Sequence, residues 1–162
     1  MRILGIDPGI ARLGWGVIEK EKNDLRAVAF DCFETHTTES LPTRLTAIHT
    51  VVTELLQTYN PDVLVVEELF FGSNAKTAFA VGQARGVVLL AGGEKQIPVT
   101  VYTPLQVKTA LVGYGRAEKS QVGHMVKVIL KLKEVPKPDD TTDALAVALT
   151  YAFSQRSARV QK

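Results

Sequence analysis

Four acidic residues of this sequence are placed where they could hold metal ions. Asp7 and Glu67 each directly follow a short apolar run, and Asp140 and Asp143 stand at the start of the last expected helix. A continuous apolar run bounded by turn residues is typical of a strand buried on both faces. Ligands of open α/β sheets collect where such strands end. We therefore expect the four carboxylates to form one site.

The ligands of this expected site are oxygen atoms alone. Neither a cysteine nor a pair of histidines accompanies the four acids. Carboxylate oxygens suit Mg²⁺ or Mn²⁺ rather than zinc. Such ions stabilise the charge of a transferring phosphoryl group, so the sequence predicts metal-dependent phosphoryl transfer.

Two of the acids have an acidic neighbour. Glu68 follows Glu67, and Asp139 precedes Asp140. Successive strand residues point to opposite faces, so only one glutamate of the pair should enter the site. If Asp139 caps the last helix, Asp140 and Asp143 lie three residues apart on one helical face. The alternative is that all three aspartates only cap this helix and complement its dipole.

The composition is typical of a compact enzyme. A chain of 162 residues can form one domain with a sizeable core, and we expect residues from about 155 to 162 to form a short tail. No apolar stretch reaches membrane-spanning length, and the chain begins with an expected strand instead of a signal peptide. The single cysteine, Cys32, fits a reducing compartment. These features predict a cytoplasmic protein.

Charge is distributed unevenly along the chain, although the net charge is only +2. Residues 1–94 carry eight basic and twelve acidic side chains, whereas residues 95–133 carry seven basic side chains and one acid, Glu118. A basic segment beside an acidic metal site is what a nuclease requires, because phosphate backbones are bound electrostatically. The alternative is that these lysines only solvate helix faces, and we favour it for the lysines of residues 127–133.

Apolar periodicity and turn residues predict an α/β fold with a five-stranded mixed sheet and helices on both faces. We expect strands at residues 2–6, 14–20, 25–33, 63–66 and 99–102, and helices at residues 41–56, 74–91, 117–132 and from about 139. Thr103 followed by Pro104 is typical of the start of a further helix. A right-handed crossover places strand 63–66 beside strand 2–6, which brings Asp7 next to Glu67.

Five segments of the sequence form an ordered set of motifs. They are residues 5–9 (Gly-Ile-Asp-Pro-Gly), 66–70 (Val-Glu-Glu-Leu-Phe), 82–86 (Gly-Gln-Ala-Arg-Gly), 117–122 (Ala-Glu-Lys-Ser-Gln-Val) and 140–146 (Asp-Thr-Thr-Asp-Ala-Leu-Ala). In this order they closely resemble the RuvC family of Holliday-junction resolvases. The resemblance extends from Ile3 to about Tyr151.

The resemblance implies a ribonuclease H-like fold and a homodimer that resolves four-way DNA junctions by paired symmetric nicks, in recombination and repair. The catalytic acids and metal ligands of the family fall on Asp7, Glu67, Asp140 and Asp143, and the family pattern favours Glu67 over Glu68. Two Mg²⁺ ions, for which Mn²⁺ substitutes, would lie about 3.5–4 Å apart with Asp7 bridging them. The products would carry 5′-phosphate and 3′-hydroxyl ends. The resemblance also implies association with the RuvA/RuvB branch-migration complex.

The resemblance further assigns residues to DNA contact. Lys119 matches the family's basic residue near the scissile phosphate and Lys108 matches a second one, although either lysine could simply be solvated. Phe70 matches a base-stacking aromatic, and the alternative is a core residue under a loop. Tyr114 and Arg116 are further candidates for contact with the DNA backbone.

Small residues recur at four-residue steps in the expected helix 74–91, at Ala78, Gly82 and Gly86. Glycine inside a helix costs up to about 1 kcal/mol relative to alanine, so the row suggests close approach of another backbone. The alternative is packing on the chain's own sheet. A C₂ dimer supplies two matching sites for a two-fold junction, and the resemblance implies a dimer through this helix.

Other functions fit the sequence less well. The run Asp7-Pro8-Gly9 is also similar to the phosphate loop of actin-like ATPases, but those enzymes need a second domain of similar size. A catalytically inactive junction-binding module is disfavoured by the intact set of acids. A ribonuclease H-like nuclease that processes RNA ends stays open, although the basic segment 108–119 and Phe70 favour junction DNA.

Overall fold

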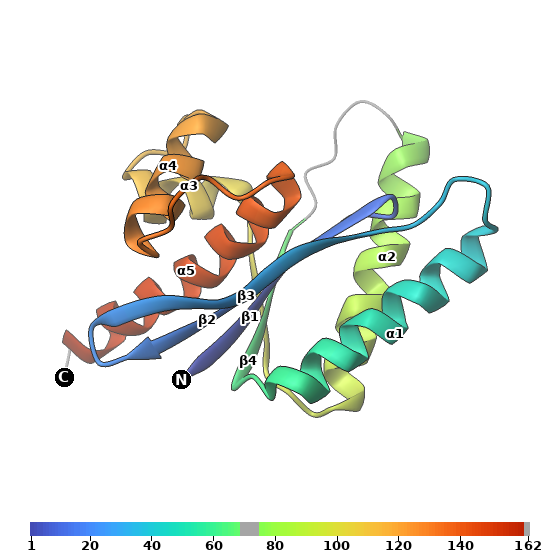
Figure 1. The fold of residues 1–162 in the computed structure, drawn as a ribbon, viewed down its shortest axis with the longest axis horizontal. Helices are drawn as coiled ribbons and strands as arrows, with labels where there is room; N and C mark the ends of the chain where they lie inside the picture. Colours follow the sequence, from blue (N-terminus) through green and yellow to red (C-terminus); the bar gives the residue numbers. More distant parts are fainter. Residues whose placement is uncertain (69–74, 161–162) are drawn as a thin grey trace.

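The computed structural model describes the backbone of residues 1–68 and 75–160 and the side chains of residues 1–68 and 78–155 (Figure 1). The elements in chain order are β1 (Arg2–Pro8), β2 (Arg12–Glu21), β3 (Asp24–Glu34), α1 (Leu41–Tyr59), β4 (Val63–Glu67), α2 (Ala75–Glu94), β5 (Val99–Tyr102), α3 (Pro104–Val112), α4 (Lys119–Ile129) and α5 (Asp139–Val160). Every strand and helix expected from the sequence is present.

The five strands form one mixed sheet in the order β3-β2-β1-β4-β5. β1 pairs antiparallel with β2, and β2 pairs antiparallel with β3. β4 pairs parallel with both β1 and β5. The predicted neighbourhood of β1 and β4 is confirmed, and Ile6 lies opposite Val66. The residues that follow this pair, Asp7 and Glu67, therefore lie side by side at the ends of neighbouring strands.

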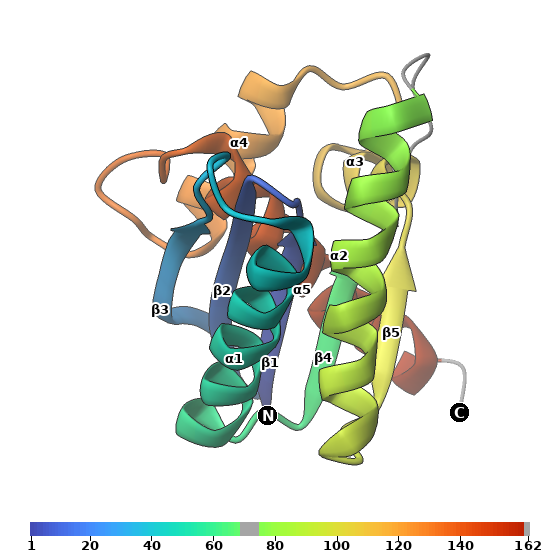
Figure 2. The ribbon, with the colours of Figure 1, turned by 90° about the vertical axis from the view of Figure 1, so that its right-hand side faces the viewer.

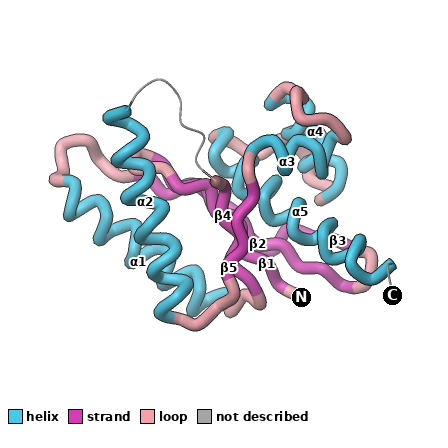
Figure 3. The backbone as a smooth tube through the Cα atoms, turned by 180° about the vertical axis from the view of Figure 1, so that it is seen from behind, coloured by secondary structure: helices cyan, strands magenta, loops and turns pink. Residues whose placement is uncertain are grey.

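Helices cover both faces of the sheet (Figures 1 and 3). α1 and α2 lie side by side on one face (Figure 2). α5 lies on the other face, with α3 and α4 outside it. Alternate residues of β1 enter the two cores: Leu4 and Ile6 pack under α1 and α2, whereas Ile3 packs under α5. By this alternation Gly5 and Asp7 also face α5.

Glycines in the sheet allow α5 to approach β1 and β2 closely. A Cβ atom on Gly14 would lie 2.0 Å from the carbonyl oxygen of Asp140, and one on Gly5 would lie 2.1 Å from that of Ala144. Gly16, which is paired with Gly5, instead makes room for the side chain of Leu145, whose Cδ2 would lie 2.5 Å from an added Cβ atom. Only residues without a side chain leave room for the helix backbone here. These contacts fix the start of α5 above the end of β1.

The ends of α4 and α5 differ from expectation. α4 begins at Lys119 instead of residue 117, because the backbone N–H of Glu118 donates to Gln121 Oε1 at 2.8 Å and stands just outside the helix. Asp139 is the first residue of α5 and not its cap. α5 also continues to Val160, past the tail expected from residue 155. The start of α3 is as predicted: the Thr103 hydroxyl accepts from the backbone of the first turn.

Among residues 1–68 and 75–160, we find no helix with both the length and the apolar character needed to cross a bilayer.

Substitution of Gly14 tests the close approach of α5. Gly14→Ala puts a Cβ atom against the backbone of Asp140, so we expect a loss of unfolding free energy of at least about 1–3 kcal/mol in urea denaturation. Gly93→Ala is the matched control, because a Cβ atom there meets nothing within 4 Å. That variant should keep or slightly raise stability. Equal stability of the two variants would show that α5 does not depend on Gly14.

Candidate active site

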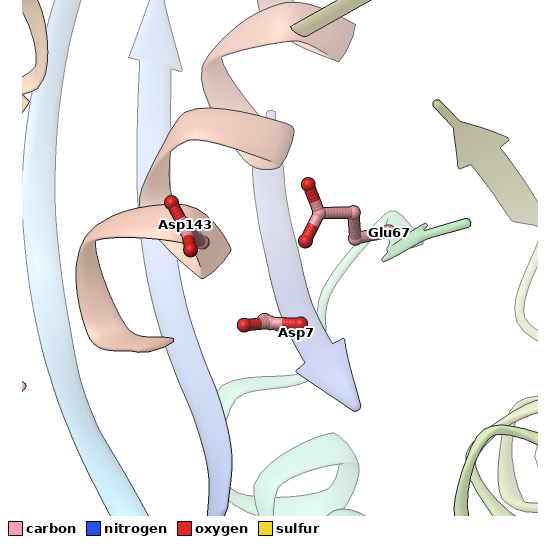
Figure 4. A group of neighbouring side chains, drawn as sticks. All are labelled: Asp7, Glu67 and Asp143. Atoms are coloured by element: carbon pink, nitrogen blue, oxygen red, sulfur yellow. The ribbon is translucent and has the colours of Figure 1, made fainter. Parts of the chain in front are cut away.

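Three carboxylates meet where β1, β4 and α5 come together (Figure 4). Asp7 and Glu67 lie at the ends of their strands, and Asp143 lies one turn into α5. One carboxylate oxygen from each residue lies within 4.8 Å of the others. Val65 packs under α5, and Glu67 follows it by two residues, so strand alternation turns Glu67 toward the same helix.

Glu68 does not join this cluster. Its side chain is exposed, and its backbone N–H donates to the carbonyl oxygen of Tyr102 at 2.8 Å. That bond continues the pairing of β4 with β5 beyond the end of the strand. Of the two neighbouring glutamates, the structure thus brings Glu67 to the other acids, as the alternation of strand side chains requires.

The carboxylates retain protons because they are buried and close together. Burial, and then the charges of Asp143 and Asp140, raise the pKa of Asp7 to about 7. Burial and the charge of Asp7 raise the pKa of Glu67 to about 9. Burial also raises the pKa of Asp143, although its contact with Lys119 acts in the opposite direction. These shifts favour a proton on Glu67 at neutral pH when no metal is bound, together with a hydrogen bond between Glu67 and Asp7.

The cluster fits a hard divalent cation. Its donors are carboxylate oxygens only, which is the chemistry that Mg²⁺ and Mn²⁺ prefer. Protons on Asp7 and Glu67 reduce the negative charge of the carboxylate cluster. A bound cation would neutralise the same charge. Metal binding to such a site must release protons.

Lys119 is the cation that contacts the cluster in this structure. Its Nζ donates to Asp143 Oδ2 at 3.0 Å, and this bond raises the pKa of the ammonium group. The lysine side chain is 69% exposed, whereas that of Asp143 is 20% exposed. Lys119 therefore reaches from solvent at the start of α4 to the edge of the buried acids.

Asp140 lies beside the cluster and outside the group of three, contrary to the expectation of four converging carboxylates. Its Oδ2 is 3.9 Å from Arg12 Nη1, and Arg12 Nε donates to Glu34 Oε1 at 3.2 Å. Arg12, at the start of β2, thus draws Asp140 toward the β2–β3 side. Its charge still raises the pKa of Asp7. The sequence interpretation missed Arg12, because its contact with Asp140 forms only where β2 and α5 pack together.

The other proposed DNA-contact residues lie on or between α3 and α4. Lys108 is half-buried on α3, and Arg116 is exposed in the connection to α4. Tyr114 is 48% exposed, and its hydroxyl donates to Gln121 Oε1 at 2.8 Å. The same oxygen accepts from the residue before α4, so Tyr114 also braces the helix that carries Lys119. Phe70 lies outside the described residues.

The row of small residues lies on a partly exposed face of α2. Ala78 and Gly82 are half-buried, and Gly86 is exposed. A Cβ atom on Gly86 would meet nothing within 4 Å, so this glycine does not serve packing on the chain's own sheet. On the same helix Phe79 is 76% exposed and Leu90 is 55% exposed. On this helix the exposed side chains of Phe79 and Leu90 therefore lie on either side of Gly86 in the sequence, which has no side chain.

Comparison with solved structures gives the class of the fold. The structure of RuvC from Thermus thermophilus superposes with a TM-score of 0.89 at 43% identity, covering 98% of this chain and 97% of that chain. The same protein in complex with a Holliday junction substrate gives 0.89 at 41% identity, covering 97% and 96% of the two chains. The yeast mitochondrial resolvase Ydc2 shares the fold at 14% identity, with a TM-score of 0.74 over 97% of this chain and 80% of that chain. The chain therefore has the ribonuclease H-like fold of these nucleases.

Sequence comparison gives the family. The profile of the family described as crossover junction endodeoxyribonuclease RuvC matches residues 3–151. A relative of that name from Brevibacillus brevis is 54% identical over 94% of this chain and 92% of its own length. Another, from Halothermothrix orenii, is 50% identical over 96% and 94%. The chain belongs to the RuvC family of crossover junction endodeoxyribonucleases.

The protonated carboxylates make the stability of the metal-free protein depend on pH. The pKa of Glu67 is higher in the folded than in the unfolded protein, so the folded protein binds more protons between about pH 4.5 and 9. Stability should therefore fall as pH rises through this window, by on the order of a few kcal/mol. Urea denaturation in a chelator should give a shallower fall for Glu67→Gln than for the unsubstituted chain. Parallel curves would contradict the protonation of Glu67.

Proposed function

We propose that this chain is a hydrolase that resolves four-way DNA junctions by paired symmetric nicks in DNA recombination and repair. The observation that carries the proposal is the buried carboxylate cluster of Asp7, Glu67 and Asp143, in a chain of the RuvC family. The Thermus relative in complex with a Holliday junction supports the choice of substrate. We take the whole chain as one nuclease domain.

The acids would hold two Mg²⁺ ions, with Mn²⁺ as a substitute. Asp7, Glu67 and Asp143 would supply oxygen ligands, with Asp7 expected to serve both ions. Asp140 would be the fourth ligand if its side chain turned away from Arg12. The contact to be given up is long, because Asp140 Oδ2 lies 3.9 Å from Arg12 Nη1. When bound, such ions make water acidic enough to act as a nucleophile at neutral pH and neutralise charge at the scissile phosphate.

The hydrolysis would be an in-line displacement at phosphorus. A water oxygen bonds to phosphorus opposite the 3′ oxygen, the P–O3′ bond breaks, and the 3′ oxygen takes up a proton. The products carry 5′-phosphate and 3′-hydroxyl ends. Lys119 is placed to balance charge on the phosphoryl oxygens, because its ammonium group already contacts Asp143 while most of the side chain faces solvent.

The DNA would approach the α3 and α4 side of the cluster. Lys108 and Arg116 lie on or near these helices, in the segment that carries seven basic side chains and one acid. Phosphate contacts of this kind supply affinity without sequence preference. Tyr114 is half-exposed in the connection between α3 and α4, where its ring would touch the DNA backbone. We assign Phe70 to contact with bases whose stacking is already broken at the crossover of the junction.

A homodimer through α2 would give the two nicks their symmetry. Gly86 leaves room for a second backbone, and the exposed side chains of Phe79 and Leu90 supply apolar area on the same helix. A two-fold axis then relates both the two active sites and the two strands that are cut. We also propose that the protein works in the cytoplasm and associates with the RuvA/RuvB branch-migration complex.

A nuclease acting on RNA ends is the main alternative. Labelled four-way junction, linear duplex of the same sequence and an RNA–DNA hybrid should be compared with Mg²⁺ present. Paired nicks should appear in the junction alone. Faster cleavage of the hybrid would favour the alternative.

Replacing each of the four acids by its neutral amide distinguishes a role in DNA cleavage from a role in DNA binding. Asp7→Asn, Glu67→Gln, Asp140→Asn and Asp143→Asn should each reduce nicking at least about a thousandfold, because each removes a metal ligand. Gel-shift binding of the junction should stay the same or become tighter, because each removes negative charge that faces DNA. Glu68→Gln is the matched control and should nick nearly normally. Loss in Glu68→Gln with full activity in Glu67→Gln would reverse the assignment.

Replacing Lys119 tests its role at the phosphate. Lys119→Ala should lower the nicking rate on saturated junction at least about tenfold and affect affinity less. Lys127→Ala on the same helix should leave that rate unchanged and at most reduce the salt slope by about one unit. An unchanged rate in Lys119→Ala would remove Lys119 from the active site.

A further inference from the structure

A hollow of about 290 Å³ opens between α1 and the β2–β3 ribbon, on the face of the sheet opposite α5. Leu13 and Val17 of β2 pack under α1, and Trp15 between them has the same orientation by strand alternation. The carboxylate cluster faces α5, so the hollow lies across the sheet from it. α2 covers the other side of α1, away from β3 (Figure 2).

Aromatic side chains form much of the wall of this hollow. Trp15 and Phe33 come from the sheet, and Tyr59 comes from the last turn of α1. The rings of Trp15 and Tyr59 lie 5.9 Å apart between centroids and are tilted by 37°. None of the three is fully buried, so ring surface faces the hollow. The negative faces of such rings attract cations.

Carboxylates complete the lining. Asp31 and Glu54 both border the hollow and are exposed, and none of the nine lining residues is basic. Asp31 Oδ1 accepts from the backbone N–H of Cys32 at 2.7 Å, which holds this carboxylate in place. Glu54 has no ion-pair partner among the described side chains. Two carboxylates thus stand beside aromatic surface, and neither has an ion-pair partner among the described side chains.

We propose that this hollow binds a cationic side chain, an arginine or lysine, presented by a partner protein. Its size is below the range of about 300–1,000 Å³ typical of small-molecule pockets, so it suits a single side chain. The aliphatic stem of an arginine would pack against Leu55 and the rings, and its guanidinium group would pair with Asp31 and Glu54. Nucleic acid is disfavoured, because the same carboxylates repel phosphate.

The location lets partner and substrate bind together. The hollow lies across the sheet from the carboxylate cluster and on the far side of α1 from the exposed face of α2. A basic segment could therefore attach to the enzyme without covering either surface.

Trp15 is the only tryptophan of the chain, so its fluorescence reports on this hollow. The full-length protein would be titrated with the peptide acetyl-Gly-Arg-Gly-amide and with its citrulline counterpart, which has nearly the same shape without the charge. The arginine peptide should change the emission saturably, with half-saturation at about 1 mM, a weak affinity in keeping with one side chain. The citrulline peptide should not. No saturable change, or an equal response to citrulline, would overturn the proposal.

Charge-neutral variants locate the site. The double variant Asp31→Asn/Glu54→Gln should raise the half-saturating peptide concentration about fivefold, since both carboxylates would lose their ion pair with the guanidinium group. Glu39→Gln, at an exposed acid before α1, is the matched control and should behave like the unsubstituted chain. An unchanged value in the double variant would overturn the proposal. Both variants should nick junctions at the normal rate, and a tenfold loss in the double variant would assign this face to DNA instead.

Discussion

The close approach of α5 to β1 and β2 is the constraint on which the active site depends. Gly5, Gly14 and Gly16 leave no side chains under the first turns of the helix, so its backbone rests directly on the sheet. This contact carries Asp143 to Asp7, and the parallel pairing of β1 with β4 adds Glu67. A larger residue in the sheet would lift the helix and separate the carboxylates, so packing and chemistry are set by the same contact.

The contact has an electrostatic cost. Three carboxylates that converge in a buried place repel one another, and the raised pKa values of Asp7 and Glu67 express this repulsion. Protons, the ammonium group of Lys119 or metal ions can each relieve it. Buried, like-charged acids of this kind are typical of functional sites, because the fold gains nothing from them. The interactions that hold them together must come from elsewhere, chiefly from the apolar cores on both faces of the sheet.

Much of this arrangement can be predicted from the sequence because it depends on local periodicity. Apolar runs and turn residues predict the strands and helices, and strand alternation predicts that one of Glu67 and Glu68 joins Asp7. The offset of Asp140 could not be predicted in this way. It depends on Arg12, which reaches it from another element, and such a contact is visible only once the elements are packed. The motifs also do not indicate how far α5 extends: Ala152 of this helix is buried in the core, and the helix continues to Val160.

The two faces of the sheet separate the proposed activities of the chain. In β1, residues that alternate with Leu4 and Ile6 face α5 and end in Asp7, whereas Trp15 of β2 faces α1 and borders the hollow. Each strand side chain points to one face only, so the backbone of the sheet lies between the carboxylate cluster and the aromatic hollow. Substitution on one face should therefore leave the other nearly unchanged, because side chains on opposite faces of a sheet share few contacts through which to couple.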